Sequence, residues 1–436
     1  MKLRALILCC LGVPAIAGDL PAPVTDVDFM PTTIEGVELG RLLFYDPVLS
    51  GSNSVSCATC HHPRLGTSDG LSLGLGDGGS GLGTDRIVVS DNLPEKRIPR
   101  NAPALFNLGA LEFTSLFHDG RLEADDSKPG GIRTPLGQDM VAGFSGVLSA
   151  QTMFPVLSAD EMAGHYSENE ISRAVRLGML AHEGGAWDLI AKKVAAIPEY
   201  RARFDAVIDD SPIQFTDIAN AMAEFIAVEW RATDSPFDQV LAGTGSISPQ
   251  AQAGMQLFYG KAGCSACHSG PFQTDHGFHA IAMPQIGPGK AERFETHNRD
   301  TGRMRVTGQA EDAYRFRTPS LRNVALTGPY GHTGAFATLQ AVVRHHLDPV
   351  ASLMSYDPTQ AVLPTFAEAT EWDMAVMASA ADLMAIAGAN ELSPVMLSDA
   401  DTAAVVAFLH ALTDPISQQG RMGVPQTVPS GFAVDQ

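Results

Sequence analysis

Four of the six cysteines carry the most specific chemical signal in this 436-residue chain. They form two C-x-x-C-H motifs, which consist of Cys57, Cys60, His61, Cys264, Cys267 and His268. The spacing is the attachment signature of c-type haem. Two thiols one helical turn apart reach the two vinyl groups of one macrocycle, and the next histidine places its imidazole beneath the iron. Two disulfides, a redox pair or a zinc pair are the alternatives, but two matching copies favour two covalently bound haems.

The first 17 residues have the features of a secretory signal peptide. Lys2 and Arg4 precede a short apolar stretch, and residues 15–17 form an A-x-A cleavage site. We therefore expect export to the periplasm. A lipoprotein anchor at Cys10 is the alternative, although no small residue directly precedes this cysteine. No later segment approaches 18 uninterrupted apolar residues, so no membrane span is predicted.

The charge balance restricts the class of partner. The chain has 29 Lys and Arg against 49 Asp and Glu, a formal net charge of −20. Removal of the signal peptide takes away two positive residues and no acid, which makes the charge about −22. Such acidity excludes nucleic acid as a partner and permits a basic partner protein.

An internal repeat surrounds the two haem motifs. The pattern G-x-x-L-F-Y precedes each motif, at residues 40–45 and 254–259. Each copy predicts the end of an amphipathic helix whose Leu and aromatic side chains pack on a haem edge. Two further helices with N-cap chemistry are predicted over residues 215–230 and 398–412. Each of these helices is expected to close its haem domain.

A Gly- and Ser-rich stretch near residues 240–248 separates the two units. It leads to Ser248-Pro249, a favourable N-cap and N1 pair for the next helix. We expect two cytochrome c domains, at residues 18–245 and 246–436. Because no run of alternating strands occurs, the predicted fold is all-α, with long loops between the helices.

The motifs resemble those of the bacterial dihaem cytochrome c peroxidases and their relative MauG, over nearly the whole mature chain. The resemblance rests on LGRLLFYDPVLS at 39–50, RNAP at 100–103, DGR at 119–121, FHAIAMPQIGPG at 278–289 and RTPSLRNVALTGPYGHTGAFATL at 317–339. It implies that hydrogen peroxide reacts at the N-terminal haem and that the C-terminal haem passes or stores electrons.

The resemblance implies an open coordination position at the first iron. Many members of the family place a ligating loop histidine about 16 residues after the position of His61, where this chain has Asp77. No His, Met or Cys occurs between His62 and His118. We therefore expect a five-coordinate, high-spin iron that needs no reductive activation, as in MauG.

The family's proton carrier for peroxide cleavage is a glutamate with a glutamine ten residues before it and a proline four residues after that glutamine. Gln151, Pro155 and Glu161 match these offsets, so Glu161 is the expected acid–base residue. A solvated Glu161 in a polar turn is the alternative, and Asp160 is the competing carboxylate.

The second iron is expected to have two histidine ligands. The family places the ligand opposite His268 fourteen residues after the position of His332, which is His346 here. It is a methionine in the peroxidases and a tyrosine in MauG. His345 is the alternative ligand. Replacement of methionine by imidazole would lower the haem potential, which favours storage of oxidising equivalents.

At other positions this chain matches the family pattern only in part. His118 replaces the tryptophan that lies between the haems, and it is either a proton-responsive bridge or a buried, hydrogen-bonded imidazole. Residues 122–150 contain an insertion of about 23 residues, which forms either a loop or a partner surface. The family's calcium ligands, one asparagine side chain and two backbone carbonyls, correspond to Asn101, Thr327 and Pro329.

The resemblance thus predicts an enzyme that reduces hydrogen peroxide and draws electrons through the second haem from a partner protein. In a MauG-like version the electrons come from a side chain of the partner. In a peroxidase version they come from a small cytochrome or cupredoxin. A dihaem electron carrier without catalysis is the alternative from another class, and it requires two six-coordinate irons.

Overall fold

The computed structural model describes residues 20–165, 168–290 and 295–436, so the predicted signal peptide lies outside the described residues. Most regular structure is helical. The α-helices are α1 (Ile34–Tyr45), α2 (Cys57–Cys60), α3 (Val147–Gln151), α4 (Glu170–Arg176), α5 (Ala186–Ala195), α6 (Pro198–Ile208), α7 (Phe215–Glu229), α8 (Pro236–Leu241), α9 (Pro249–Phe258), α10 (Met304–Thr307), α11 (Leu339–Leu347), α12 (Pro349–Met354), α13 (Thr370–Asp373), α14 (Ala380–Gly388), α15 (Asp399–His410) and α16 (Pro415–Gln419). Among the described residues, no helix is both long and apolar enough to span a membrane.

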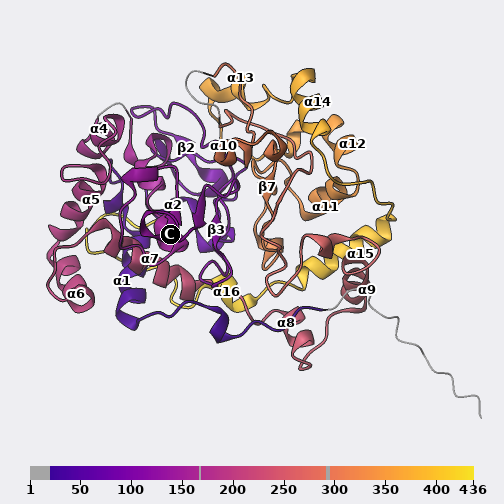
Figure 1. Ribbon diagram of the computed structural model, residues 1–436, viewed down its shortest axis with the longest axis horizontal. Helices are drawn as coiled ribbons and strands as arrows, with labels where there is room; N and C mark the ends of the chain where they lie inside the picture. Colours follow the sequence, from indigo (N-terminus) through magenta and orange to yellow (C-terminus); the bar gives the residue numbers. More distant parts are fainter. Residues whose placement is uncertain (1–19, 166–167, 291–294) are drawn as a thin grey trace, which may run out of the picture.

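Two helix pairs form the framework of the molecule. Helix α1 packs on α7, and α9 packs on α15, at opposite sides of the view in Figure 1. A Cβ atom on Gly40 would overlap the carbonyl oxygen of Ala221, and one on Gly254 would overlap that of Ala404. Glycine is therefore required in both copies of the repeat because the two helix backbones approach so closely. The predicted repeat is confirmed as a repeated helix crossing.

Each helix pair belongs to a separate hydrophobic core. The larger core draws its buried residues from positions 37–230 together with Val428, and the other draws them from positions 237–412. Phe44 and Trp230 pack in the first core with ring centres 5.1 Å apart, and Phe258 and Phe408 pack in the second at 5.2 Å. The predicted helices over 215–230 and 398–412 are confirmed, since they correspond to α7 and α15.

Short strands supplement the helices, which the all-α expectation missed. They are β1 (Gly79–Ser80), β2 (Ile87–Val88), β3 (Ser115–Leu116), β4 (Leu122–Ala124), β5 (Ile132–Arg133), β6 (Phe278–His279) and β7 (Phe316–Arg317). The pairs β1–β2 and β6–β7 and the sheet β3–β4–β5 are antiparallel. The insertion at 122–150 thus supplies two strands, and its Ile132 and Met140 are buried in the first core.

The C-terminal tail returns to the first helix pair, and the C-terminus lies beside α2 in Figure 1. Ser430 Oγ donates to the buried Asp46 carboxylate at 2.7 Å, and Thr59 Oγ1 donates to Asp435 at 2.6 Å. The buried Glu229 carboxylate accepts backbone N–H groups of residues 421–423. The tail therefore contacts the helix that carries the first cysteine pair.

Candidate haem centres and their surroundings

The first C-x-x-C-H motif forms the short helix α2. Its histidine, His61, has Nδ1 3.0 Å from the carbonyl oxygen of Thr67. A carbonyl oxygen only accepts, so Nδ1 donates and Nε2 keeps its lone pair for a metal. Burial raises the pKa of the Cys57 and Cys60 thiols to about 12. The four motif cysteines form no disulfide.

The second motif has the same arrangement at its histidine. His268 Nδ1 lies 3.1 Å from the carbonyl oxygen of Gln273, which again leaves Nε2 free. Burial, with a smaller contribution from the charge of His346, lowers the pKa of His268 to about 4. The ring is therefore the neutral imidazole that binds metal.

His346 lies opposite His268 and satisfies the geometry of a second ligand. The two ring centres are 6.4 Å apart. Two imidazoles on opposite sides of one metal, each bonded at about 2 Å, have ring centres about 6 Å apart. His346 Nδ1 donates to the carbonyl oxygen of Val342 at 2.8 Å, in the preceding turn of α11, so its Nε2 is free.

The neighbouring His345 is oriented differently. Its Nε2 lies 2.8 Å from the carbonyl oxygen of Ile281, and its ring packs on Phe336 with centres 4.9 Å apart. The nitrogen that points away from the helix is therefore used in a backbone hydrogen bond. The structure brings His346, not His345, to His268.

Glu161 lies in a one-turn π-helix, Ala159–Ala163, a distortion that is frequent at functional sites. Burial raises the pKa of Glu161, while the charges of Lys290 and Arg121 oppose the rise. The turn is fixed from behind, because Asp77 N–H donates to the Glu161 carbonyl oxygen at 2.9 Å. Glycine is required at Gly76, where a Cβ would overlap the backbone of residues 160–161.

The other two residues of the predicted proton-carrier motif flank this turn. Gln151 ends α3, and its Oε1 is buried without a hydrogen-bond partner among the described residues. Pro155 opens a 3-10 turn that leads through Ser158 into the π-helix. An unpartnered buried amide oxygen costs free energy unless a ligand or water serves it. Gln151 therefore offers an unused polar atom to a ligand or water.

Comparison with known proteins decides the family. The family model for di-haem cytochrome c peroxidase matches residues 34–246. The methylamine utilization protein MauG of Methylorubrum extorquens is 32% identical over 73% of this chain and 70% of its own length. The cytochrome c551 peroxidase of Nitrosomonas europaea is 32% identical over 72% of this chain and 73% of its own. The chain belongs to the dihaem cytochrome c peroxidase and MauG family.

Solved structures agree with this assignment. A MauG-like protein associated with microbial copper homeostasis is 25% identical, with a TM-score of 0.59 over 94% of this chain and 96% of its own. The diheme peroxidase BthA of Burkholderia thailandensis, at 21% identity, has the same fold with a TM-score of 0.60 over 97% of each chain. Our protein is thus a haem oxidoreductase with peroxide-related activity and two c-type haems.

One arginine without a counter-ion among the described residues fits a bound haem. Arg317, on β7, is partly buried, and its Nε donates to the Phe117 carbonyl oxygen at 3.2 Å. One of its terminal nitrogens is buried without a partner among the described residues. Burial alone lowers the pKa of Arg317 to about 10. A buried charge without a counter-ion is strongly unfavourable, and the carboxylates of a bound haem would supply that counter-ion.

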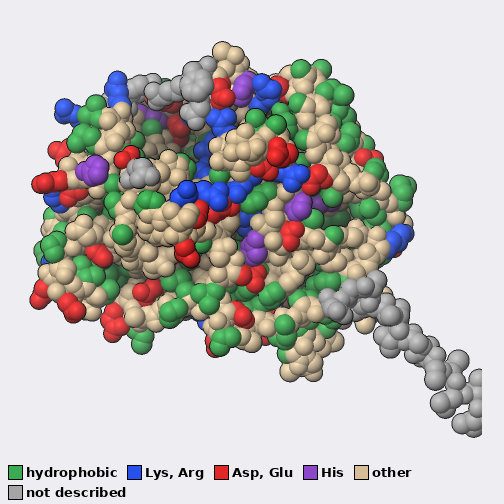
Figure 2. Space-filling model, viewed as in Figure 1, with side chains coloured by type: hydrophobic (Ala, Val, Ile, Leu, Met, Phe, Trp, Pro, Cys, Tyr) green, Lys and Arg blue, Asp and Glu red, His purple; other side chains and the backbone are tan. Residues whose placement is uncertain are grey.

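A polar cluster lies beside Glu161. The buried Arg100 pairs with Asp119 and with Asp300, each at 2.7 Å. Arg121 lies over the Phe117 ring at 3.7 Å, and burial lowers the pKa of Lys290 to about 8. Figure 2 shows that basic side chains also gather at the surface, in a band across the middle of that face.

The residue that replaces the family's tryptophan, His118, is partly buried and hydrogen-bonded. Its Nε2 lies 3.1 Å from the carbonyl oxygen of Asn101. Burial and the charge of Arg100 lower the pKa of His118 to about 4. His332, on the other side of Asn101, stacks on Phe316 at 3.7 Å, and neither of its ring nitrogens has a hydrogen-bond partner among the described residues.

Two residues at the predicted calcium positions make internal hydrogen bonds through side-chain donors, which are not the predicted ligand atoms. Asn101 Nδ2 donates to the Leu71 carbonyl oxygen at 2.7 Å, and Thr327 Oγ1 donates to that of Val324 at 3.1 Å. Within the described part of the chain, no hydrogen bond joins Asn101 to Thr327 or Pro329. Calcium therefore stays a prediction.

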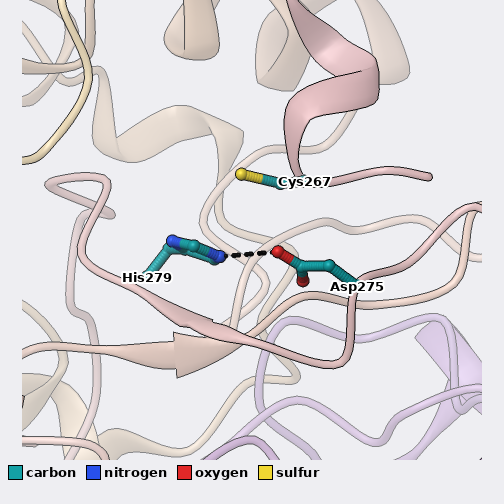
Figure 3. A group of neighbouring side chains, drawn as sticks. All are labelled: Cys267, Asp275 and His279. Atoms are coloured by element: carbon teal, nitrogen blue, oxygen red, sulfur yellow. Dashed lines mark hydrogen bonds and ion pairs between the residues drawn. The ribbon is translucent and has the colours of Figure 1, made fainter.

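A second polar group lies next to the second motif. Figure 3 shows Cys267 facing the pair Asp275 and His279, which are 2.9 Å apart. His279 Nδ1 also lies 3.4 Å from Glu391. These side chains could hold a metal together with the thiol, but covalent attachment of haem would consume Cys267. We therefore interpret Asp275 and His279 as the polar surroundings of the attachment site. Sequence reasoning missed this contact because no spacing rule connects Glu391 to the motif.

Proposed function

We propose that this protein reduces hydrogen peroxide at an N-terminal haem held by His61 and takes the electrons from a partner protein through a C-terminal haem held by His268 and His346. The observation that carries the proposal is the difference between the two histidines. His268 faces a second imidazole, whereas no ring contact pairs His61 with any other imidazole in the described residues, which include all 13 histidines.

Asp77 stands where many relatives have the histidine that closes the first iron. Its contacts support an open coordination position in this protein. Asp77 accepts hydrogen bonds from Ser52 and Ser54 and from Asn92 Nδ2 at 3.0 Å. These contacts hold the Asp77 carboxylate among neutral donors from the segment before α2 and from Asn92. A carboxylate that is anchored in this way is not free to serve as a ligand.

Glu161 would act as the proton carrier. A bound haem iron supplies the electrons that cleave the O–O bond. Glu161 accepts a proton from one peroxide oxygen and returns it to the other, which leaves as water. The charges of Arg121 and Lys290 keep a fraction of Glu161 ionised despite its burial, and the unpartnered Gln151 oxygen accepts a hydrogen bond from peroxide or a leaving water.

The pair of imidazoles supports the MauG-like version. Two neutral histidines favour a low potential at the second haem, since imidazole lowers the potential relative to methionine. A low-potential centre holds an oxidised state more easily, which suits slow oxidation of a side chain on a partner protein. Export to the periplasm and a calcium ion at Asn101, Thr327 and Pro329 belong to the same proposal.

One equivalent of peroxide, added to the air-oxidised protein, distinguishes the MauG-like version from the peroxidase version and from an electron carrier. We expect an optical change that lasts for minutes without a donor and that decays faster with a partner protein bearing an oxidisable aromatic side chain. Fast turnover with a reduced small cytochrome or cupredoxin would instead support the peroxidase version, which the names of several relatives favour. No optical change with peroxide would support an electron carrier.

A further inference from the structure

Three metal-binding side chains converge beside the Glu161 turn. Asp160 lies inside the π-helix, His165 follows it, and Glu95 comes from a loop more than sixty residues earlier in the chain. One ring nitrogen of His165 and one carboxylate oxygen from each acid lie within 4.8 Å of one another. The His165 Nδ1 to Glu95 Oε1 distance is 3.9 Å.

His165 is the decisive member of this group. The residue is 6% exposed, yet neither ring nitrogen has a hydrogen-bond partner among the described residues. Leaving both nitrogens of a buried imidazole unpaired costs the desolvation free energy of a polar group. A metal ion would accept the lone pair of one nitrogen and so remove part of that cost, and the two carboxylates beside the ring would balance the charge of the ion.

We propose that Glu95, Asp160 and His165 bind one divalent metal ion of the class of zinc. One imidazole and two carboxylates match the ligands that zinc takes in proteins, and three protein ligands leave a fourth position for water. Calcium prefers a shell made of oxygen ligands alone, so this site is chemically separate from the predicted calcium site. The proposal does not rest on the peroxide chemistry.

When no metal is bound, Lys96 balances part of the negative charge of the site. Its Nζ lies 3.5 Å from Asp160 Oδ2, and its side chain is 46% exposed. The lysine neutralises the carboxylate and can swing into solvent when a cation binds. A bound metal would join the Glu95 loop to the turn that carries Glu161, so occupancy would stiffen this turn.

Zinc titration of the full-length, haem-loaded protein tests the site, after treatment with a chelator and in excess calcium. We expect one equivalent of Zn²⁺ by calorimetry and by metal analysis. Glu95→Gln should weaken binding at least about tenfold, and His165→Ala should weaken it further. Lys96→Met should tighten it, because a competing cation is removed. His410→Ala, which changes an exposed histidine, should bind as the wild type does.

Three results would overturn the proposal: no binding to the wild type, equal binding to Glu95→Gln and the wild type, or loss of binding in His279→Ala instead. Because the Glu95 side chain is 37% exposed, Glu95→Gln should fold normally, and its unchanged thermal midpoint would verify this. The decision therefore does not depend on the stability of His165→Ala. All readouts are made without peroxide, so failure of the proposed enzyme activity would leave this test intact.

Discussion

The two haem regions share a scaffold and differ in what faces the histidine. In both, a glycine allows two helices to cross closely, and the histidine Nδ1 donates to a backbone carbonyl so that Nε2 is free. Opposite His268 lies the imidazole of His346. The first region instead has a π-helical turn that carries the partly buried Glu161. In the function that we propose, the scaffold holds one histidine ligand in each region, and the side chains on the other side of each haem determine the chemistry.

Among the substitutions that test this difference between the regions, Glu161→Gln should have the largest effect on the reaction with peroxide. The amide keeps the shape of the side chain but cannot accept the peroxide proton, so we expect the rate of reaction with peroxide to fall about 10²- to 10⁴-fold. Stopped-flow absorbance measures this rate. Asp160→Asn, assayed in metal-free buffer because Asp160 is a proposed metal ligand, is the matched control and should have little effect. An unchanged rate in Glu161→Gln, or a large loss of rate in Asp160→Asn, would indicate that Asp160 and not Glu161 accepts the peroxide proton.

His346→Met would make the second region resemble the peroxidases. We expect its midpoint potential to rise by on the order of 0.1 V or more, within the about 0.8 V that axial ligands span. Spectroelectrochemistry measures the change. His345→Gln can keep a hydrogen bond to the Ile281 carbonyl and should leave the potential near that of the wild type. A large shift in His345→Gln with none in His346→Met would contradict the assignment.

The shared helix crossing can be tested in both regions with one type of change. Gly40→Ala and Gly254→Ala each place a Cβ against a backbone carbonyl of the facing helix, so each should destabilise the protein by about 1–3 kcal/mol. Thermal unfolding measures the loss. Gly388→Ala, at a helical position with open space around it, should be neutral or slightly stabilising. A neutral result for only one of the first two would show that the crossings are not equivalent.

The smallest expected effect is a shift in pH dependence at the first region. Burial raises the pKa of Glu161, and the charge of Lys290 lowers it. Because ionised Glu161 accepts the proton, the peroxide rate should fall as pH drops through this pKa. Lys290→Met removes a lowering charge, so the acid limb should move to higher pH by less than about one unit. A shift to lower pH would contradict the account, and Lys261→Met, at an exposed site, is the control.

Local patterns in the sequence predicted the features that depend on spacing. The repeat, helices α7 and α15 and the Ser248 N-cap of α9 are as expected. The fourteen-residue offset from His332 selected His346, which the geometry supports over His345.

Features that depend on contacts between distant segments were missed. Strands β4 and β5 escaped prediction because three and two residues are too few for an alternating pattern. The return of the tail to Asp46 is fixed by hydrogen bonds between segments far apart in the chain, and no local periodicity records such bonds. The convergence of Glu95 with His165 belongs to the same class.

Electron paramagnetic resonance of the air-oxidised, haem-loaded protein tests the asymmetry most directly. We expect one high-spin ferric signal from the centre held by His61 and one low-spin signal from the centre held by His268 and His346. The low-spin signal alone should change in His346→Met. Two low-spin signals in the wild type would show that a side chain closes the first iron, and they would contradict the central claim.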